Sequence, residues 1–267
     1  MDLELRGKTA LVTGSYRGTG RAIAAVLAKE GARVLVHGFE RDAAEGVAGD
    51  LRAKGYEALA IAGDIRNEAG AAEAAADAVK AAGEVHILVN NYGVAEGNSW
   101  KRSDTAEWID SYQKNVLSGM RMAQHLMGPM KERGWGRIIN LGTIGSTMPG
   151  ARMPHYYAAK GALATMTASL AKELAGTGIT VNLVSPGIIR TPEIEAHFMA
   201  QAKEKGWGGT WAEIEPKVLE SFMGNLTGHV TEPEEVGELV AFIASPRAPS
   251  LTAFNFRIDG GATALML

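Results

Sequence analysis

The chain has 267 residues, of which 46% are hydrophobic and 21% charged, proportions that suit one large globular α/β domain with a sizeable core. Its formal net charge of −3 gives no bulk electrostatic attraction to nucleic acid or to an anionic membrane. Because the sequence contains no cysteine, disulfides, thiolate nucleophiles and cysteine-ligated metal sites are excluded.

Seven apolar runs in the chain have the length of β-strands. They are residues 8–14, 32–38, 57–64, 85–91, 136–142, 178–187 and 253–261. The runs are almost continuously apolar, which is typical of strands that helices cover on both faces. Helical patterns between them predict parallel strands joined by right-handed crossovers. We therefore expect an α/β fold: a Rossmann-type, doubly wound, seven-stranded parallel sheet with helices on both faces, in a single domain over residues 1–267.

Two helical patterns and one irregular segment follow the fourth strand. The first helical pattern runs from about Thr105 to Arg133, and the second begins near Tyr156. The segment from about 190 to 228 is irregular and only partly helical, and such long insertions are usually functional. We expect a substrate loop or lid that closes an apolar pocket, with ordinary packing against the sheet as the alternative. Its bulky side chains are His197, Phe198, Met199, Trp207, Trp211, Phe222 and Met223.

Other features indicate where the protein works. No apolar run approaches the roughly 18 residues that a membrane-spanning helix needs. The start, MDLELRGKTALVTG, lacks a basic region followed by an apolar stretch, so no signal peptide is expected. The six histidines have no metal-ligand spacing, so we expect no metal site. His155, next to Tyr156, is interpreted as a surface residue, with a position facing the pocket as the alternative. We expect a cytoplasmic protein without nucleic-acid or membrane partners.

A glycine-rich turn, TGSYRGTG at residues 13–20, follows the first strand and opens a helix. Gly14 allows the tight turn, Gly18 allows the backbone to approach a pyrophosphate, and Gly20 allows close helix–strand packing. The N–H groups at the start of a helix favour an anion. The pattern predicts a dinucleotide cofactor held by Gly14, Ser15, Tyr16, Arg17, Gly18, Thr19 and Gly20.

The end of the second strand bears on the choice between NADP and NAD. An acidic residue there binds the ribose 2′-hydroxyl of NAD, but this chain has Gly38 and Phe39, and no carboxylate until Glu40. Arg17, in the glycine turn, can reach a 2′-phosphate. The sequence therefore favours NADP, with NAD as the alternative.

Six motifs in register resemble the short-chain dehydrogenase/reductase superfamily along essentially the whole chain. They are TGSYRGTG at 13–20, GDI at 63–65, NNYG at 90–93, Asn115 in KNVLSG, YYAAK at 156–160 and SPGIIRT at 185–191. The tail, GHVTEPEEVGELVAFIASP followed by RIDGG, is similar to 3-oxoacyl-carrier-protein reductase-like members.

The resemblance implies further cofactor-binding residues. Asp64 and Ile65 would flank the adenine, and Asn91 and Gly93 would line the cofactor after the fourth strand. Tyr92 stands where the family has a small residue. The nicotinamide end would be held by Pro186, Gly187, Ile189 and Thr191. The family also implies a homotetramer, or a homodimer, built through the two long helices.

The catalytic set is also implied by the resemblance. The family's tyrosine lies four residues before a lysine, which selects Tyr156 and Lys160 and leaves Tyr157 to pack at the pocket edge. A phenol has a pKa of about 10, and we expect the neighbouring ammonium to lower it. Tyr156 would then be the general acid in reduction and the general base in oxidation. Lys160 would also hold the ribose, and Asn115 would join a proton relay.

One catalytic position departs from the family pattern. The family has a serine thirteen residues before the tyrosine, where this chain has Thr143. Threonine keeps the hydroxyl but adds a methyl that stiffens the side chain. We expect Thr143 to substitute functionally and Ser146 to be a less suitable replacement.

These residues together predict an enzyme. We expect an NAD(P)-dependent oxidoreductase that moves a hydride between nicotinamide and a small-molecule carbonyl or secondary alcohol, as a 3-oxoacyl-carrier-protein reductase or a related ketone reductase does. The alternative is a nucleotide-sensing or scaffold protein with weak or no activity, which Thr143 and Tyr92 would suit.

Overall fold

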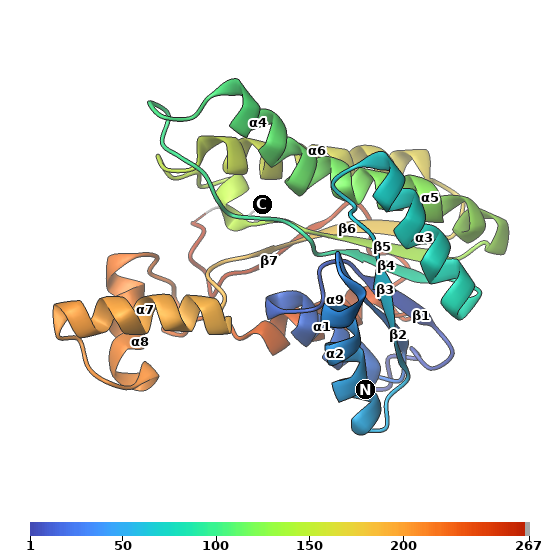
Figure 1. The fold of residues 1–267 in the computed structure, drawn as a ribbon, viewed down its shortest axis with the longest axis horizontal. Helices are drawn as coiled ribbons and strands as arrows, with labels where there is room; N and C mark the ends of the chain where they lie inside the picture. The colour runs from blue at the N-terminus through green and yellow to red at the C-terminus, as the bar shows by residue number, and fades with distance from the viewer. Residues whose placement is uncertain (265–267) are drawn as a thin grey trace.

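A single parallel sheet forms the centre of the molecule in the computed structural model, which describes residues 1–264. The strand order is β3-β2-β1-β4-β5-β6-β7, and all neighbouring pairs are parallel (Figure 1). The strands are β1 (Thr9–Val12), β2 (Arg33–Gly38), β3 (Ala58–Ala62), β4 (Ile87–Asn90), β5 (Gly136–Leu141), β6 (Ile179–Pro186) and β7 (Asn255–Ile258). The predicted seven-stranded parallel fold is confirmed.

The order of the strands creates a crevice at the carboxyl edge of the sheet. β2 and β3 lie on one side of β1, and β4 to β7 lie on the other. The loops that leave β1 and β4 therefore turn away from each other. Ligands of open parallel sheets bind at such a point.

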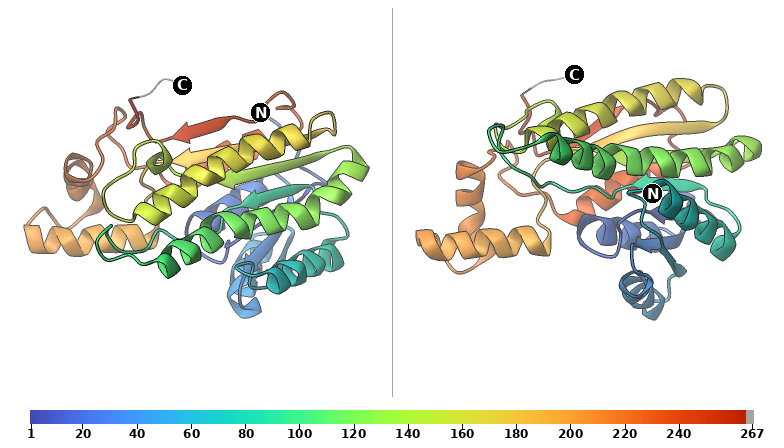
Figure 2. Two further views of the ribbon diagram at one scale, coloured as in Figure 1. Left: turned by 90° about the horizontal axis from the view of Figure 1, so that it is seen from above. Right: turned by 45° about the horizontal axis from the view of Figure 1, so that its top comes forward.

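Helices cover both faces of the sheet (Figure 2). The helices α1, α2 and α9 lie on one face, and α3, α5 and α6 lie on the other. Their bounds are α1 (Gly18–Lys29), α2 (Arg41–Ala53), α3 (Glu68–Ala82), α4 (Thr105–Tyr112), α5 (Ser118–Arg133), α6 (Pro154–Glu173), α7 (Pro192–Lys205), α8 (Trp211–Ser221) and α9 (Pro233–Ala244).

The two faces have separate apolar cores because successive strand residues point in opposite directions. Val12 and Val89 lie in the core beneath α1 and α9, whereas Leu11 and Leu88 lie in the core beneath α3 and α5. All four side chains are fully buried. Burial of each contributes about 1.5–3 kcal/mol. Packing on both faces explains why the strands read as continuous apolar runs.

The predicted helix from Thr105 to Arg133 is interrupted. A π-helical turn, Gln113–Leu117, separates α4 from α5. The predicted helical region from about Thr105 to Arg133 is therefore confirmed, with a π-helical turn that the sequence did not indicate. Such a turn inserts one residue into an α-helix and often marks a functional site. Asn115 lies in it.

The segment after β6 contains two helices joined by short loops, so the expectation of a partly helical segment is confirmed and its irregular part is smaller than expected. Thr191 caps α7 by accepting a hydrogen bond from the Ile194 N–H, and Thr210 and Glu213 form a capping box at the start of α8. The two helices project from one end of the sheet in Figures 1 and 2. They enclose a small apolar core of their own, made by Phe198, Ala202, Trp211, Ile214, Val218, Leu219 and Val230.

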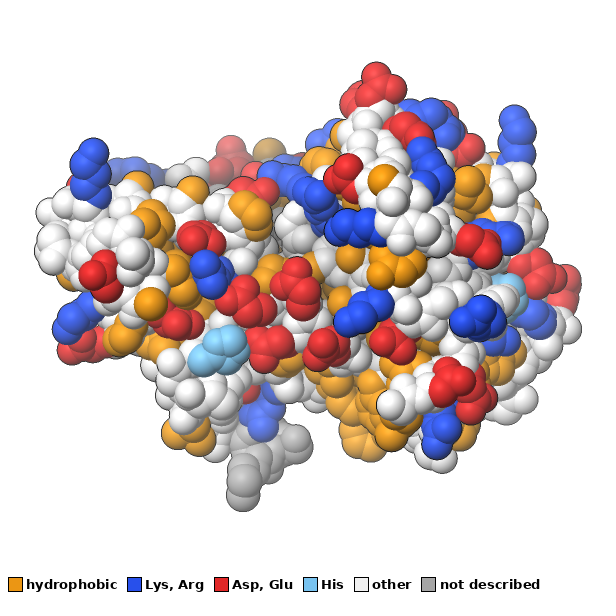
Figure 3. Space-filling model, turned by 90° about the horizontal axis from the view of Figure 1, so that it is seen from below, with side chains coloured by type: hydrophobic (Ala, Val, Ile, Leu, Met, Phe, Trp, Pro, Cys, Tyr) orange, Lys and Arg blue, Asp and Glu red, His pale blue; other side chains and the backbone are white. Residues whose placement is uncertain are grey.

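Surface features agree with the composition. No helix within residues 1–264 combines the length and the hydropathy that crossing a membrane would require. Acidic and basic side chains are interspersed over the face seen in Figure 3. That face therefore presents no broad basic surface of the kind that binds a polyanion.

Candidate active site

The glycine turn after β1 forms one wall of a groove at the carboxyl edge. Gly14 and Gly18 have φ of +64° and +54°, in the left-handed region that favours glycine. A Cβ on Gly20 would collide with the Asn91 amide and lie 2.8 Å from the Gly14 carbonyl oxygen. The groove has a volume of about 410 Å³, and Tyr16, Arg17, Thr19 and the start of α7 also line it.

A second group of residues meets across the groove from the glycine turn, namely Lys160, Asn115 and Gly93. A Cβ on Gly93 would lie 2.8 Å from Asn115 Oδ1 and 2.9 Å from Lys160 Nζ, so only glycine leaves room for both. Lys160 is 4% exposed and its ammonium donates to the Leu141 carbonyl at 2.7 Å. Burial lowers the pKa of Lys160 to about 8.

The Asn115 side chain holds the loop after β4. Its Oδ1 accepts from the Val94 N–H at 2.9 Å, and its Nδ2 donates to the Val94 carbonyl at 3.1 Å and to the Ser111 carbonyl at 3.0 Å. The amide is therefore satisfied by the backbone. It fixes the position of Gly93 beside Lys160, and a role in a proton relay stays a prediction.

Tyr156 and Thr143 also come together. Burial raises the pKa of Tyr156 to about 12, the neighbouring Tyr157 adds to this, and the nearby Thr143 side chain acts in the opposite direction. Lys160 is not among the groups that shift it. The expectation that Lys160 lowers this pKa is therefore wrong for the protein alone, because burial outweighs every favourable contact and the ammonium faces Leu141.

The hydroxyl of Thr143 keeps its proton for an acceptor at the Tyr156 phenol or for a substrate oxygen. Its Oγ1 accepts from the Gly145 N–H at 3.1 Å, which leaves its own proton available. In contrast, the Ser146 hydroxyl donates to the Thr143 carbonyl at 2.8 Å. Of these two hydroxyls, that of Thr143 influences the phenol, and that of Ser146 is engaged by backbone.

Comparison with known proteins decides the family. The family model of short chain dehydrogenases matches residues 8–201. The chain belongs to the short-chain dehydrogenase family. This membership makes it an NAD(P)-dependent oxidoreductase and confirms the resemblance seen in the sequence.

Relatives of this short-chain dehydrogenase match it over almost their full lengths. An uncharacterized oxidoreductase of Bacillus subtilis, YvaG, is 34% identical and is covered to 98%, as is this chain. The 3-oxoacyl-[acyl-carrier-protein] reductase FabG of Escherichia coli is also 34% identical, over 97% of this chain and 98% of its own. L-sorbose reductase from Gluconobacter frateurii, solved with NADPH and L-sorbose, has a TM-score of 0.92 at 29% identity, with both chains fully covered.

The glycine turn of this short-chain dehydrogenase depends on a histidine that the sequence analysis did not single out. His37, at the end of β2, accepts from the Gly14 N–H through Nδ1 at 3.0 Å and therefore donates to the Gly63 carbonyl through Nε2, also at 3.0 Å. Burial lowers the pKa of His37 to about 4, so it is neutral. Ser15 is buried beside it and donates to the Val12 carbonyl at 2.7 Å, so only the Ser15 backbone can reach a cofactor.

The neutral His37 should make stability depend on pH. Its pKa is lowered from 6.5 to about 4 in the folded protein, so between these values the unfolded chain binds a proton that the folded protein does not. The free energy of unfolding therefore has its full contribution from His37 above pH 6.5. It falls by about 3 kcal/mol as the pH is lowered toward 4. Denaturant unfolding of wild type and of His37→Gln should be measured across this pH range. The difference between their free energies of unfolding should vary by about the same amount. Parallel pH curves would contradict the prediction.

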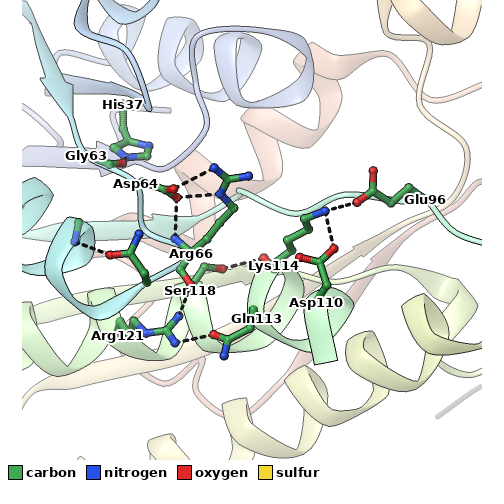
Figure 4. A network of polar contacts seen from close by, with 12 residues as sticks. His37, Gly63, Asp64, Arg66, Glu96, Asp110, Gln113, Lys114, Ser118 and Arg121 are labelled. Carbon is green, nitrogen blue, oxygen red and sulfur yellow. Dashed lines mark hydrogen bonds and ion pairs between the residues drawn. The ribbon is translucent and has the colours of Figure 1, made fainter. Parts of the chain in front are cut away.

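The adenosine end of the site contains aromatic side chains together with the Asp64–Arg66 pair, and Figure 4 shows that pair. Phe39 follows Gly38 at the end of β2 and contacts Tyr92 edge to face, with ring centroids 5.1 Å apart. The Tyr92 side chain thus fills the space between Phe39 and Gly14. Asp64 is bound in a bidentate manner by Arg66, whereas the Ile65 side chain is buried in the core and leaves only its backbone for a cofactor.

The nicotinamide end is shaped by the loop after β6. Pro186 ends the strand, and a Cβ on Gly187 would lie 3.2 Å from the Asp259 backbone. Ile189 pairs with Thr231 in an isolated bridge. Thr191 faces the glycine turn, since a Cβ on Gly18 would lie 3.9 Å from its methyl group. The loop therefore closes the groove opposite the turn.

Two aromatic neighbours of Tyr156 are structural. A Cβ on Gly145 would collide with the Tyr157 ring, so Tyr157 packs against the loop after β5. His155 is 3% exposed and its ring contacts Trp108, with centroids 5.9 Å apart. The interpretation of His155 as a surface residue is therefore wrong, because α4 and the loop before it cover the start of α6.

Proposed function

We propose that this protein is an NADP-preferring oxidoreductase that transfers a hydride between nicotinamide and the carbonyl or secondary alcohol of a small molecule, with Tyr156 as general acid and base. The observation that carries the proposal is that Tyr156 and the Thr143 side chain that influences it lie at the same edge of the sheet as Lys160 and the glycine turn. A nucleotide sensor has no use for this arrangement.

The residues present fit a nicotinamide dinucleotide. The glycines of the turn leave space that a Cβ would fill, and the N–H groups at the start of α1 favour a pyrophosphate. Preference for NADP is supported by Arg17 at the groove and by the missing carboxylate after β2. Two similar structures, L-sorbose reductase and a 3-oxoacyl reductase from Agrobacterium tumefaciens, were solved with NADPH or NADP.

In the proposed mechanism the nicotinamide supplies or accepts the hydride. The Thr143 hydroxyl donates a hydrogen bond to the substrate oxygen and orients it toward Tyr156. Tyr156 gives its proton to the developing alkoxide in reduction and takes it back in oxidation. The Lys160 ammonium, held at the Leu141 carbonyl, would donate to the ribose hydroxyls of the cofactor and so position the nicotinamide.

The substrate class can be tested by following nicotinamide absorbance. Purified protein would be assayed with NADPH and NADH against 3-oxoacyl thioesters, ketoses and simple ketones, with cofactor affinity measured in parallel. We expect turnover of at least one class and a lower Kd for NADPH than for NADH. Tight cofactor binding without turnover would instead favour a sensor, which the high pKa of Tyr156 also supports.

Other expectations remain part of the proposal. We place α7 and α8, within residues 190–228, as the lid over the substrate, since they begin beside the nicotinamide loop. We also propose a cytoplasmic homotetramer or homodimer, which analytical ultracentrifugation of the purified protein would distinguish.

A further inference from the structure

A guanidinium lies at the end of β2 although the sequence has no basic side chain there. β2 and β3 pair in parallel with Gly38 opposite Ala62, so the loops that follow them leave the sheet side by side. Arg66, from the loop after β3, reaches across and places its guanidinium 4.6 Å above the Phe39 ring. The ribose of a bound dinucleotide is expected at the end of the second strand.

We propose that Arg66 recognises the 2′-phosphate of NADP and is a specificity-determining residue of this site. The inference rests on the proposed use of NADP. The residue after β2 is Phe39, which carries no charge. In this proposal Arg66, from the loop after β3, supplies the positive charge instead. Stacking on Phe39 fixes the plane of the guanidinium, as cation–π contacts do.

The guanidinium keeps donors for a ligand. Its Nε and Nη2 each donate to Asp64 at 2.8 Å (Figure 4). A guanidinium has five N–H donors, so the others remain for phosphate oxygens. The Arg66 side chain is 43% exposed, which leaves room for a ligand to approach.

The backbone of this loop is fixed before any ligand arrives. The Arg66 N–H donates to Asp64 Oδ1 at 3.1 Å, and the Arg66 carbonyl accepts from Arg121 of α5 at 3.1 Å. Anchored donors lose less conformational entropy on binding than mobile ones do. Arg66 is thus held ready at the mouth of the site.

The other nearby arginines are less suitable. Arg41, the next basic residue after β2, donates to the Ala60 carbonyl at 2.9 Å and to Asp77 at 2.5 Å, so it faces β3 and α3. Arg17 lies 3.7 Å from Glu193 at the start of α7. Arg17 can contribute from the glycine side, and Arg66 would approach the phosphate from the Phe39 side.

Calorimetric binding to the full-length protein tests the proposal without turnover. Four ligands would be used: NADPH, NADH, adenosine 2′,5′-bisphosphate and adenosine 5′-monophosphate. Arg66→Gln should raise the Kd of the two ligands with a 2′-phosphate by about 10- to 100-fold. The other two ligands should change by less than about twofold. Arg66→Lys, which keeps the charge but loses the planar fork, should give an intermediate loss.

Arg21→Gln is the matched control. Arg21 pairs with Asp50 on the outer side of the same half of the sheet, at 2.9 Å and with a similarly exposed side chain, so its removal changes net charge equally. It should alter none of the four Kd values. Melting temperatures of all variants would verify folding.

The outcomes separate this inference from the proposed function. Equal weakening of all four ligands would mean that Arg66 stacks on adenine, and no weakening would mean that it touches neither group; both results overturn the inference. A wild type that prefers NADH would contradict the proposed cofactor. Even then, a selective loss of adenosine 2′,5′-bisphosphate in Arg66→Gln would support Arg66 as the 2′-phosphate contact.

Discussion

Replacing Tyr156 with phenylalanine should lower kcat by about 10²- to 10⁴-fold, the range that one positioned proton donor contributes, while the Kd of the cofactor stays the same. In the proposed mechanism the Tyr156 phenol transfers the proton, whereas the Thr143 hydroxyl only donates a hydrogen bond. Phenylalanine keeps the ring packing against Tyr157, where the centroids are 5.4 Å apart. Steady-state kinetics with a ketone substrate and fluorescence titration of NADPH measure the two quantities.

The neighbouring tyrosine offers a matched control. Tyr157→Phe removes the same hydroxyl from the next residue, whose ring packs against the loop after β5. We expect kcat to change by no more than about threefold, since no catalytic contact is lost. Equal losses in the two variants would mean that packing, and not proton transfer, explains the effect, and a larger loss in Tyr157→Phe would reassign the acid.

The direction of the reaction gives a second readout for Tyr156. Burial raises its pKa to about 12, so the neutral phenol dominates at ordinary pH in the protein alone. Reduction needs the neutral phenol and should not gain from higher pH. Oxidation of the alcohol needs the phenolate, so its rate should rise with pH. Tyr156→Phe should remove this rise.

The sheet could be predicted from the sequence because each strand is buried on both faces and is bounded by turn residues. The π-helical turn at Gln113–Leu117 could not, since one inserted residue hardly disturbs a helical pattern. The extent of the α7–α8 pair was underestimated for another reason. Its apolar residues, such as Phe198 and Trp211, are divided between two helices separated by Gly206, Gly208 and Gly209, and they form a core only once the helices meet.

The candidate site shows the same division between local and long-range information. Fixed spacing identified Tyr156, Lys160 and Thr143, which lie in one helix and the loop before it. His37 and Arg66 have no such spacing, because their contacts cross from one strand end to the next. A lone histidine in an apolar strand is only weak evidence of a functional role. The position of His37 next to Gly38, at the end of the strand, adds a little to that evidence.

The threonine that replaces the family's serine sets the last expectation. Thr143→Val keeps the shape of the side chain but removes the hydroxyl, and we expect kcat/KM to fall by about 100-fold, as for the loss of one donor to a developing oxyanion. Thr143→Ser should stay within about fivefold of wild type, because it keeps the hydroxyl and loses only a methyl group. A fall in kcat equal to that in kcat/KM would show that the hydroxyl acts in the transition state.

Ser146→Ala distinguishes the two hydroxyls after β5. Because the Ser146 hydroxyl already donates to the Thr143 carbonyl, its loss should cost far less activity than Thr143→Val. A larger loss in Ser146→Ala would transfer the role to Ser146. If wild type were as slow as Thr143→Ala and Thr143→Ser restored the rate, threonine would be an impaired substitute, and the site would be that of a weak catalyst. The position of Thr143 beside Tyr156 argues for the opposite result, since the Gly145 N–H satisfies the acceptor side of this hydroxyl and leaves its proton to donate to the phenol or the substrate.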